Sequence, residues 1–390
     1  MIFLGQASNY SAGRIFKHLF ARGRKEDAGA LKKALAKKYK VKDSEKVILY
    51  HTGRSALAAA FISVVPKKSY VIIPGLTCIA VVRAVRAADC IPVFVDIDPE
   101  TLQYDWQKLV TKLEELQPKG DRSSQEKLPI DKKHNLCYNR IIILAQNTLG
   151  IPLDALKLEK IAQKYHATLV EDLAHSAGRF YPDGREIGTI GAATALSFGK
   201  GKAVDTIEGG ALIVRTESVT IPRPPSRLPK PSDRWRDRWY PLLGAIIRVG
   251  YRIKLGKVFT GIFLKFHWIA RSADADLDLG VGLPNWQARL AREQLTGLPK
   301  TPLRDHMFVK QRNKLLSELE ESGYYLNEIW YDVPVSPARC SREVDFPTNE
   351  CPNTVQIAKT IINFPTWYNQ ERLAPAREIA RKYEVKNEVE

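Results

Sequence analysis

The first 200 residues alternate short, continuous apolar runs with longer stretches that are amphipathic or rich in alanine. The apolar runs contain many β-branched side chains and predict strands, while the longer stretches predict helices. The predicted strands are 46–50, 71–73, 91–95, 141–144 and 167–171, and the predicted helices are 54–65, 78–88 and 154–165. Strands that are apolar throughout are typical of a parallel sheet covered by helices on both faces. The sequence therefore predicts an α/β fold.

Length and changes of pattern along the chain predict three segments. At roughly 150 residues per domain, 390 residues correspond to two or three units. We expect a large α/β domain over 1–215, a basic and apolar insert with helical character over 216–274, and a smaller C-terminal domain over 275–390. Within these segments, 118–134 is polar and predicts a surface loop, and 286–319 shows an amphipathic helical pattern.

The positive charge of the chain is concentrated in one segment. The net charge is +17, but thirteen basic and only three acidic residues lie between Arg215 and Ala273, so ten of the excess charges fall there. Such an excess indicates an anionic partner. Because residues 240–270 are also apolar, they predict either a helix lying at a membrane surface or helices packed on the protein with a solvated basic face. No nucleic-acid-binding motif accompanies the charge, so nucleic acid is not an expected partner.

The cysteines and the apolar runs indicate where the protein resides. The five cysteines are scattered, without the spacing of a zinc site or a disulfide framework, so we expect no metal and a reducing compartment. The first residues lack the pattern of a signal peptide, and no uncharged apolar run reaches the roughly 18–20 residues that span a bilayer. We therefore expect a cytoplasmic protein that could bind peripherally at the inner face of the membrane.

Four short motifs follow predicted strands, where an α/β sheet places its ligands. The first, Gly53-Arg54-Ser55, opens a predicted helix, where backbone N–H groups, the helix dipole and an arginine would bind a phosphate. An ordinary helix cap uses the same residue types. The second motif places Asp172 and His175 after a strand. A carboxylate there could face a ligand, although a helix cap and a structural histidine explain the pair equally well.

The remaining two motifs surround a lysine. Ser197 ends an apolar run and precedes a glycine-punctuated loop that carries Lys200 and Lys202, and Glu208 with two glycines enters the next run. A lysine in a partly buried site can lose its proton and attack a carbonyl, whereas an exposed one would be a solvated turn residue. A phosphate cradle, an aspartate, a serine and a lysine are together the parts that hold pyridoxal phosphate.

Together these residues resemble the DegT/DnrJ/StrS family of pyridoxal-phosphate-dependent aminotransferases, a fold-type I group that acts mostly on nucleotide-linked keto sugars. The best match is the spacing of Ser197, Lys202 and Glu208-Gly209-Gly210, supported by Glu171-Asp172-x-Ala174-His175. Further matches lie at 53–57, 92–102, 287–295 and 363–366. The resemblance implies a large domain with a mostly parallel sheet covered by helices, a smaller C-terminal α/β domain, and assembly as a homodimer.

The resemblance also implies roles for single residues. Lys202 would form the Schiff base with pyridoxal phosphate and shuttle protons, with Lys200 as the competing candidate on chemistry alone. Asp172 would pair with the pyridinium nitrogen, and His175 would lie by the ring oxygen or the ring face. The residues expected to hold the phosphate are Gly53, Arg54, Ser55 and Ser197.

Three positions depart from the family pattern. Cys78 stands where an aromatic side chain usually stacks on the cofactor, so Cys78 would line the site but His175 or another residue would have to cover the ring. Arg54 replaces a usual threonine. Gly280 and Gly282 replace an asparagine and an arginine that usually reach the phosphate of the neighbouring subunit, and Arg54 could compensate within its own subunit.

The expected function is transfer of an amino group from a donor, glutamate in the family, to a keto group. The acceptor would be sugar-like and nucleotide-linked, as in the biosynthesis of sugars or cell-envelope polysaccharides. A dehydratase or lyase on the same scaffold is one alternative, although family members that dehydrate tend to lack the lysine. A non-catalytic, membrane-associated protein that keeps the fold is the other.

Overall fold

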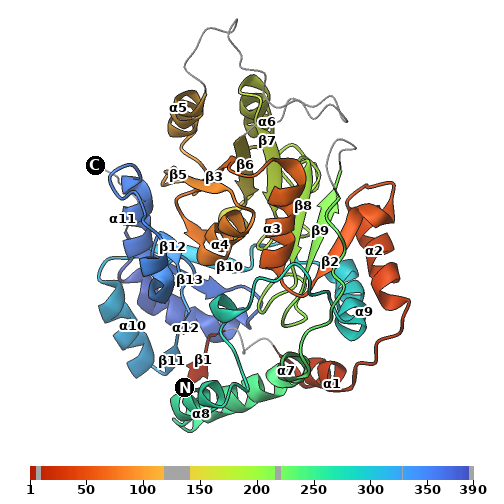
Figure 1. Cartoon of the computed structure of the whole chain (residues 1–390). Helices are drawn as coiled ribbons and strands as arrows, with labels where there is room; N and C mark the ends of the chain where they lie inside the picture. The colour runs from red at the N-terminus through yellow and green to blue at the C-terminus, as the bar shows by residue number, and fades with distance from the viewer. Residues whose placement is uncertain (6–9, 118–140, 216–220, 327, 386–390) are drawn as a thin grey trace, which may run out of the picture.

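A seven-stranded sheet forms the centre of the computed structural model, which describes residues 1–5, 10–117, 141–215, 221–326 and 328–385 (Figure 1). The strands lie in the order β2-β9-β8-β7-β6-β3-β5. Their bounds are β2 Val47–Tyr50, β3 Tyr70–Pro74, β5 Ile91–Val95, β6 Ile141–Gln146, β7 Thr168–Asp172, β8 Ala193–Ser197 and β9 Gly210–Val214. The loop expected at 118–134 lies outside the described residues.

All strands of this sheet are parallel except one. β9 is antiparallel to both of its neighbours, β2 and β8, and the remaining pairs are parallel. The carboxyl ends of β2, β3, β7 and β8 therefore meet at one edge of the sheet. This is the edge at which open α/β sheets place ligands, and the candidate residues follow these strands.

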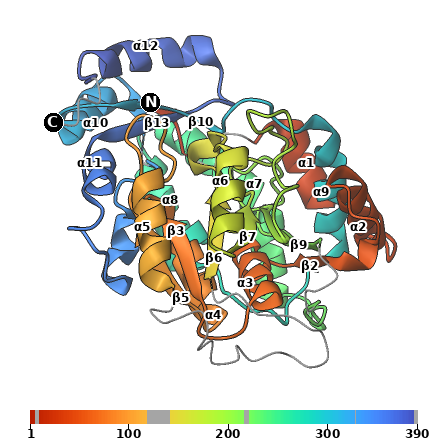
Figure 2. The same ribbon diagram turned by 90° about the horizontal axis from the view of Figure 1, so that it is seen from above.

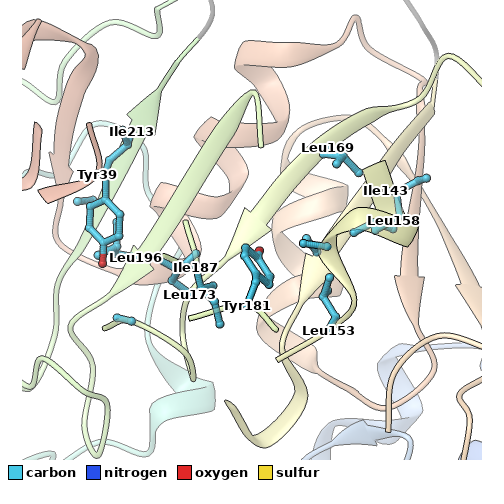
Figure 3. Close-up of a cluster of buried hydrophobic side chains, with 14 of the residues drawn as sticks. Tyr39, Ile143, Leu153, Leu158, Leu169, Leu173, Tyr181, Ile187, Leu196 and Ile213 are labelled. Carbon is cyan, nitrogen blue, oxygen red and sulfur yellow. The ribbon is translucent and has the colours of Figure 1, made fainter. Parts of the chain in front are cut away.

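Helices cover both faces of the sheet. One face carries α3 (Gly53–Val64) and α4 (Ile79–Ala87), and the other carries α2 (Asp27–Lys38), α5 (Trp106–Leu116), α6 (Ala155–Lys164) and α9 (Asn285–Gln294). Neighbouring strand residues alternate between the two cores, with Val47 and Leu49 on one side and Ile48 and Tyr50 on the other. Figure 3 shows part of the core beneath α6. Burial of both faces explains why the strands are apolar throughout, and it confirms the predicted fold class.

The smaller unit lies beside the sheet. Its strands β10 (Arg304–Phe308) and β13 (Ile361–Pro365) are antiparallel, and its helices are α10 (Arg312–Glu321), α11 (Pro352–Thr360) and α12 (Gln370–Arg381). The N-terminal strand β1 (Ile2–Phe3) pairs with β11 (Tyr324–Tyr325), so the first residues pack with the C-terminal unit. Conversely, α9 packs against α2 in the core of the large unit (Figures 1 and 2). Strand β1, from the expected segment 1–215, thus packs with the smaller unit, and α9, from the expected segment 275–390, packs with the large one.

The helical pattern expected over 286–319 was wrong in its middle. The structure has two helices there, α9 and α10, with strand β10 between them. Gly297, Pro299 and Pro302 follow α9. Proline lacks the N–H that a helix needs and glycine lowers helix stability, so the amphipathic pattern cannot continue as one helix.

Two further helices occupy the basic segment. α7 (Pro231–Arg252) and α8 (Gly256–Lys265) pack together along one edge of the molecule, with α1 (Ala12–Phe20) beside α7 (Figure 1). Their shared core contains Tyr240, Ile247, Tyr251 and Phe263. Among the helices of the described residues, none combines the length and the hydropathy needed to cross a membrane.

Candidate active site

Asp172 and Lys202 are both half-buried at the carboxyl edge of the sheet. Asp172 ends β7, and its Oδ1 accepts a hydrogen bond from the Ala174 N–H at 2.9 Å. Burial raises the pKa of Asp172, against the opposing effects of that N–H and of the Lys202 charge. Burial also lowers the pKa of Lys202, against the nearby Cys78 and Asp172. Burial thus favours the uncharged form of each group, and neither has a side-chain ion-pair partner in the described part of the chain.

The two lysines of the loop after β8 have different surroundings. Lys200 is 3% exposed, and its Nζ lies 2.8 Å from Glu208 Oε1. Burial alone would raise the pKa of Glu208, but the Lys200 ammonium, together with Arg54 and His51, holds that pKa below its usual range. Lys200 is therefore one half of a buried structural ion pair. Lys202, two residues later, is the lysine whose amine is available to a ligand.

The loop that carries Lys202 is held from within and from α9. Asp205 accepts hydrogen bonds from the N–H groups of Gly201 (2.9 Å) and Ile207 (3.0 Å). Gln287 of α9 donates to the carbonyls of Thr206 (2.9 Å) and Glu208 (3.1 Å). Ile207 has a φ of 76°, a conformation that costs energy for a β-branched residue. These contacts hold the strained loop in one conformation and so fix the position of the Lys202 backbone.

An aromatic pair from the smaller unit completes the site. The Trp330 indole stacks on the His175 ring with a centroid separation of 4.4 Å and an interplanar angle of 16°. Lys202 Nζ lies 4.5 Å from the Trp330 ring centroid, and the Tyr331 hydroxyl lies 3.2 Å from His175 Nδ1. Burial, with the Lys202 charge adding to it, lowers the pKa of His175 well below its usual value. His175 is therefore neutral near pH 7.

Trp330 is held by residues of the C-terminal unit. Asn363 accepts a hydrogen bond from the Trp330 N–H at 3.2 Å and donates one to the Trp330 carbonyl at 2.9 Å. The buried Arg304 guanidinium lies 4.8 Å from the indole centroid, and its Nε has no hydrogen-bond partner within the described residues. Arg304 Nη2 lies 3.5 Å from a Glu328 carboxylate oxygen. The site is thus built from both units, with a buried cation that can accept an anionic ligand group.

The residues expected to hold a phosphate lie at the start of α3. A Cβ on Gly53 would come within 2.6 Å of the Ser197 side chain, so glycine is needed for α3 to begin against the end of β8. The Ser55 N–H donates to Thr52 Oγ1 at 3.2 Å, which is an ordinary helix cap. In the described part of the chain, the N–H groups of Gly53 and Arg54 have no acceptor. These N–H groups and the Ser197 hydroxyl are what the structure offers an anion.

The Arg54 guanidinium is directed elsewhere. It donates to the backbone carbonyls of Ser272, Ala273 and Ala275, the last at 2.5 Å. These three carbonyls accept hydrogen bonds from the guanidinium that was expected to bind phosphate in place of the side chains missing at Gly280 and Gly282. Those glycines run beside the end of β2, where the His51 N–H donates to the Val281 carbonyl at 3.0 Å. The expected phosphate contact through the Arg54 side chain therefore does not match its observed partners.

Cys78 lies near the site but provides no aromatic cover. It precedes α4, and its Sγ accepts a hydrogen bond from the Ala80 N–H at 3.5 Å. The aromatic ring next to Lys202 comes from Trp330, which the sequence did not identify. The only signal was indirect: without an aromatic residue at position 78, another side chain had to cover the site.

Replacing Trp330 by alanine should raise the pKa of both His175 and Lys202 toward their ordinary values. The reason is that burial lowers both pKa values, and removal of the indole admits water to both groups. The NMR titration of His175 and the pH dependence of Lys202 acylation would measure the two shifts. Trp235→Ala removes an exposed indole outside the site and should leave both titrations unchanged. Unchanged titrations in Trp330→Ala would show that other groups bury the pair.

Comparison with known proteins identifies the family that the sequence motifs resemble. Residues 21–221 match the model of the DegT/DnrJ/EryC1/StrS aminotransferase family. GDP-perosamine synthase of Escherichia coli O157:H7 is 28% identical over 168 residues, which are 43% of this chain and 40% of that protein. L-glutamine:2-deoxy-scyllo-inosose aminotransferase of Micromonospora echinospora is 30% identical over 143 residues, 37% of this chain and 28% of that protein. The chain thus spans less than half the length of these curated relatives.

The fold comparison extends over most of the chain. The crystal structure of a DegT DnrJ EryC1 StrS aminotransferase from Brucella abortus superposes with a TM-score of 0.62 at 16% identity. It covers 93% of this chain and 92% of that one. At this identity the likeness establishes the fold, and its coverage extends well beyond residues 21–221, which the family model matches.

Proposed function

This chain belongs to the DegT/DnrJ/EryC1/StrS aminotransferase family, and we propose that it is a pyridoxal-phosphate-dependent aminotransferase. The amino group would pass from a donor, glutamate, to a keto group on a sugar-like, nucleotide-linked acceptor. One observation carries the proposal: the half-buried Lys202 amine forms no ion pair with a carboxylate in the described residues and lies in the field of the half-buried Asp172 carboxylate.

The residues of the site fit pyridoxal phosphate. When bound, this group supplies an electron-accepting ring that carries an amino group between donor and acceptor. Asp172 would hold a proton at the ring nitrogen, and that positive charge would offset the effect of burial on its own pKa. Lys202 would be the Schiff-base lysine and would move protons, for which its lowered pKa is suited. The Ser197 hydroxyl and the N–H groups of Gly53 and Arg54 would bind the phosphate.

His175 and Trp330 would shape the site. Their stacked rings, 4.4 Å apart, exclude water from the side on which the Lys202 amine lies. Arg304, with its unpartnered Nε, would bind a carboxylate of the donor. The acceptor class rests on the names of the relatives, one a synthase of GDP-perosamine and the other an aminotransferase of 2-deoxy-scyllo-inosose.

The proposal has two finer parts that concern partners. The first is assembly as a homodimer, as the family resemblance implies. The second is peripheral contact with a membrane through 240–270, where the chain is basic and apolar.

Covalent labelling tests the assignment of the lysine. The purified chain, reconstituted with pyridoxal phosphate, should develop a new absorbance band. Treatment with borohydride should then attach the cofactor covalently to Lys202, as peptide mapping would show. Lys202→Ala should lack both the band and the label, whereas Lys160→Ala, which changes an exposed lysine, should retain them. A label on Lys200 would contradict the assignment.

The reaction class requires a second measurement. Glutamate added to the reconstituted protein should convert the bound group to pyridoxamine phosphate and release 2-oxoglutarate in equal amount. Loss of water from a keto-sugar acceptor without consumption of glutamate would indicate a dehydratase instead. Screening nucleotide-linked against lipid-linked keto sugars would then identify the acceptor.

A further inference from the structure

All of α8 and most of α7 lie in a stretch of chain without acidic residues. Residues 238–273 contain seven lysines and arginines and no aspartate or glutamate. In the structure this stretch forms the outer edge of the molecule, with α7 and α8 packed side by side (Figure 1). Neither helix contributes to the active site beyond the contacts of Asp237 and Tyr240 behind it.

α7 has two apolar faces, and only one of them is covered. With 3.6 residues per turn, residues 240, 244, 247 and 251 share a face that is buried in the core beneath the helix. Apolar side chains at 235, 239, 246, 249 and 253 recur at the same spacing on a different face. That second face is exposed, with side-chain exposures from 36% at Trp239 to 60% at Ile253. A helix that only packed on the protein would carry polar residues there.

α8 extends this exposed surface. Val258, Ile262 and Phe266 lie along one line of α8 and are all exposed. Trp268, just after the helix, has its ring centroid 5.8 Å from that of Phe266 and 6.5 Å from that of Trp235 on α7. The exposed apolar residues of the two helices therefore form one surface, which we call the α7–α8 face.

The N-terminal helix continues the face. Phe16 and Phe20 of α1 are each 63% exposed and contact one another, with ring centroids 4.6 Å apart. Phe20 and Trp235 line the same open groove of about 860 Å³ between α1 and the start of α7. An exposed apolar surface of this extent marks an interaction site.

Unpaired cations flank the apolar residues. At about 100° per residue, Arg234 and Arg252 lie on the same side of the exposed stripe of α7, and the exposed Lys254 follows the C-terminal end of that helix. In the described part of the chain none of the three forms an ion pair with a carboxylate, and the same holds for Lys265 of α8. Their long apolar stems let the charged heads reach past the apolar residues.

The arrangement of charges decides between possible occupants of the face. A second copy of the chain would bring two basic, acid-free surfaces together, which electrostatic repulsion disfavours. A lipid surface offers what both kinds of residue need: an apolar layer for the tryptophans and aliphatic side chains, and phosphate groups for the cations. We propose that the α7–α8 face binds the surface of a bilayer that contains anionic lipids, with both helices lying along it.

Vesicle sedimentation tests the proposal with the full chain. Phosphatidylcholine vesicles that contain phosphatidylglycerol should bind at least about tenfold more protein than vesicles of phosphatidylcholine alone, and added salt should reduce the difference. The triple variant Ile246→Ser, Val249→Ser, Ile253→Ser and the double variant Arg252→Glu, Lys254→Glu should each lower binding about tenfold or more. Because all five side chains are exposed, the melting temperature of each variant should stay near that of the parent.

A matched control distinguishes binding through the α7–α8 face from non-specific binding through any exposed apolar side chain. Leu156→Ser with Phe180→Ser removes two apolar side chains that are 53% and 52% exposed elsewhere on the molecule, and it should leave vesicle binding unchanged. Lys202→Ala should also bind vesicles like the parent, so failure of the aminotransferase assignment and failure of membrane binding are distinguishable. No preference for anionic vesicles would overturn the proposal. A change of the triple variant from dimer to monomer in light scattering, without vesicle binding, would identify the face as a subunit interface and also overturn it.

Discussion

Replacement of Asp172 by asparagine should lower kcat for amino transfer by on the order of 10²-fold or more, while the protein remains folded. Asparagine has nearly the same shape and can still accept the hydrogen bond that the Ala174 N–H donates at 2.9 Å. It cannot carry the negative charge that would hold a proton at the cofactor nitrogen. The expected loss therefore concerns the reaction and not the binding of substrate, and kcat should fall while KM stays near that of the parent.

The same substitution should not destabilise the cofactor-free protein, as it would if the role of Asp172 were structural. Burial raises the pKa of Asp172, so the folded protein binds this proton more tightly than the unfolded chain does. The cofactor-free parent therefore loses stability as the pH rises from the usual aspartate range through the folded-state pKa. Asp172→Asn lacks this titration, and in the cofactor-free protein it should be at least as stable as the parent above that range. Chemical denaturation at several pH values would measure the difference.

The control for this variant is an exposed carboxylate. Asp345 lies on the surface, and Asp345→Asn should change neither kcat nor the pH dependence of stability. If Asp172→Asn kept kcat within about twofold of the parent, the assigned role of Asp172 would be wrong.

Much of the sheet and the position of Asp172 could be predicted because local sequence determines them. A strand buried on both faces has to be apolar throughout, and Val47–Tyr50 and Ile141–Gln146 both follow that rule. The carboxyl end of such a strand is where a polar residue meets ligand. Ser197 stands out as the first polar residue after its apolar run, and Asp172 follows Glu171 at the end of another run.

Trp330 and Arg304 could not be predicted because their place depends on contacts between distant segments. Trp330 reaches His175 since Asn363, in β13, hydrogen-bonds both its N–H and its carbonyl. Arg304 begins β10, whose partner β13 lies more than fifty residues later in the chain. No periodicity or spacing near either residue marks it as part of a site.

Burial of single charged residues was equally hidden in the sequence. Lys200 and Lys202 are the same residue type in the same loop, and only the ion pair with Glu208, at 2.8 Å, distinguishes the first. Arg54 follows a glycine at a helix start, which favoured a phosphate contact. The structure shows three carbonyls from 272–275 around its guanidinium instead. For Arg54 the partners lie more than two hundred residues away in the chain.

Glu171 is expected to give the largest effect on stability. This residue precedes Asp172 in β7 and therefore points to the other face of the sheet, away from the site. Its side chain is fully buried. The carboxylate accepts five hydrogen bonds at 2.7 to 3.2 Å, from the N–H groups of Gly188, Ile190 and Gly191 and from the hydroxyls of Tyr181 and Thr194. It thereby fixes the turn that leads into β8.

Glu171→Ala should lower the free energy of unfolding by about 3–5 kcal/mol, because it leaves several buried donors without an acceptor. Glu171→Gln should recover only part of that loss. Its amide oxygen can still accept hydrogen bonds, but its NH2 group would face N–H and O–H groups that are themselves donors. Chemical denaturation followed by circular dichroism would measure both variants. At temperatures where the variants remain folded, kcat should stay near that of the parent, because Asp172 and Lys202 are unchanged.

An exposed glutamate provides the control for this effect. Glu321, at the end of α10, is exposed, and Glu321→Ala should change the free energy of unfolding by no more than about 0.5 kcal/mol. A loss below about 1 kcal/mol in Glu171→Ala would mean that water replaces the carboxylate, and that the turn before β8 is held by its own backbone. A loss of kcat in folded Glu171→Gln would instead show that this turn also positions the site.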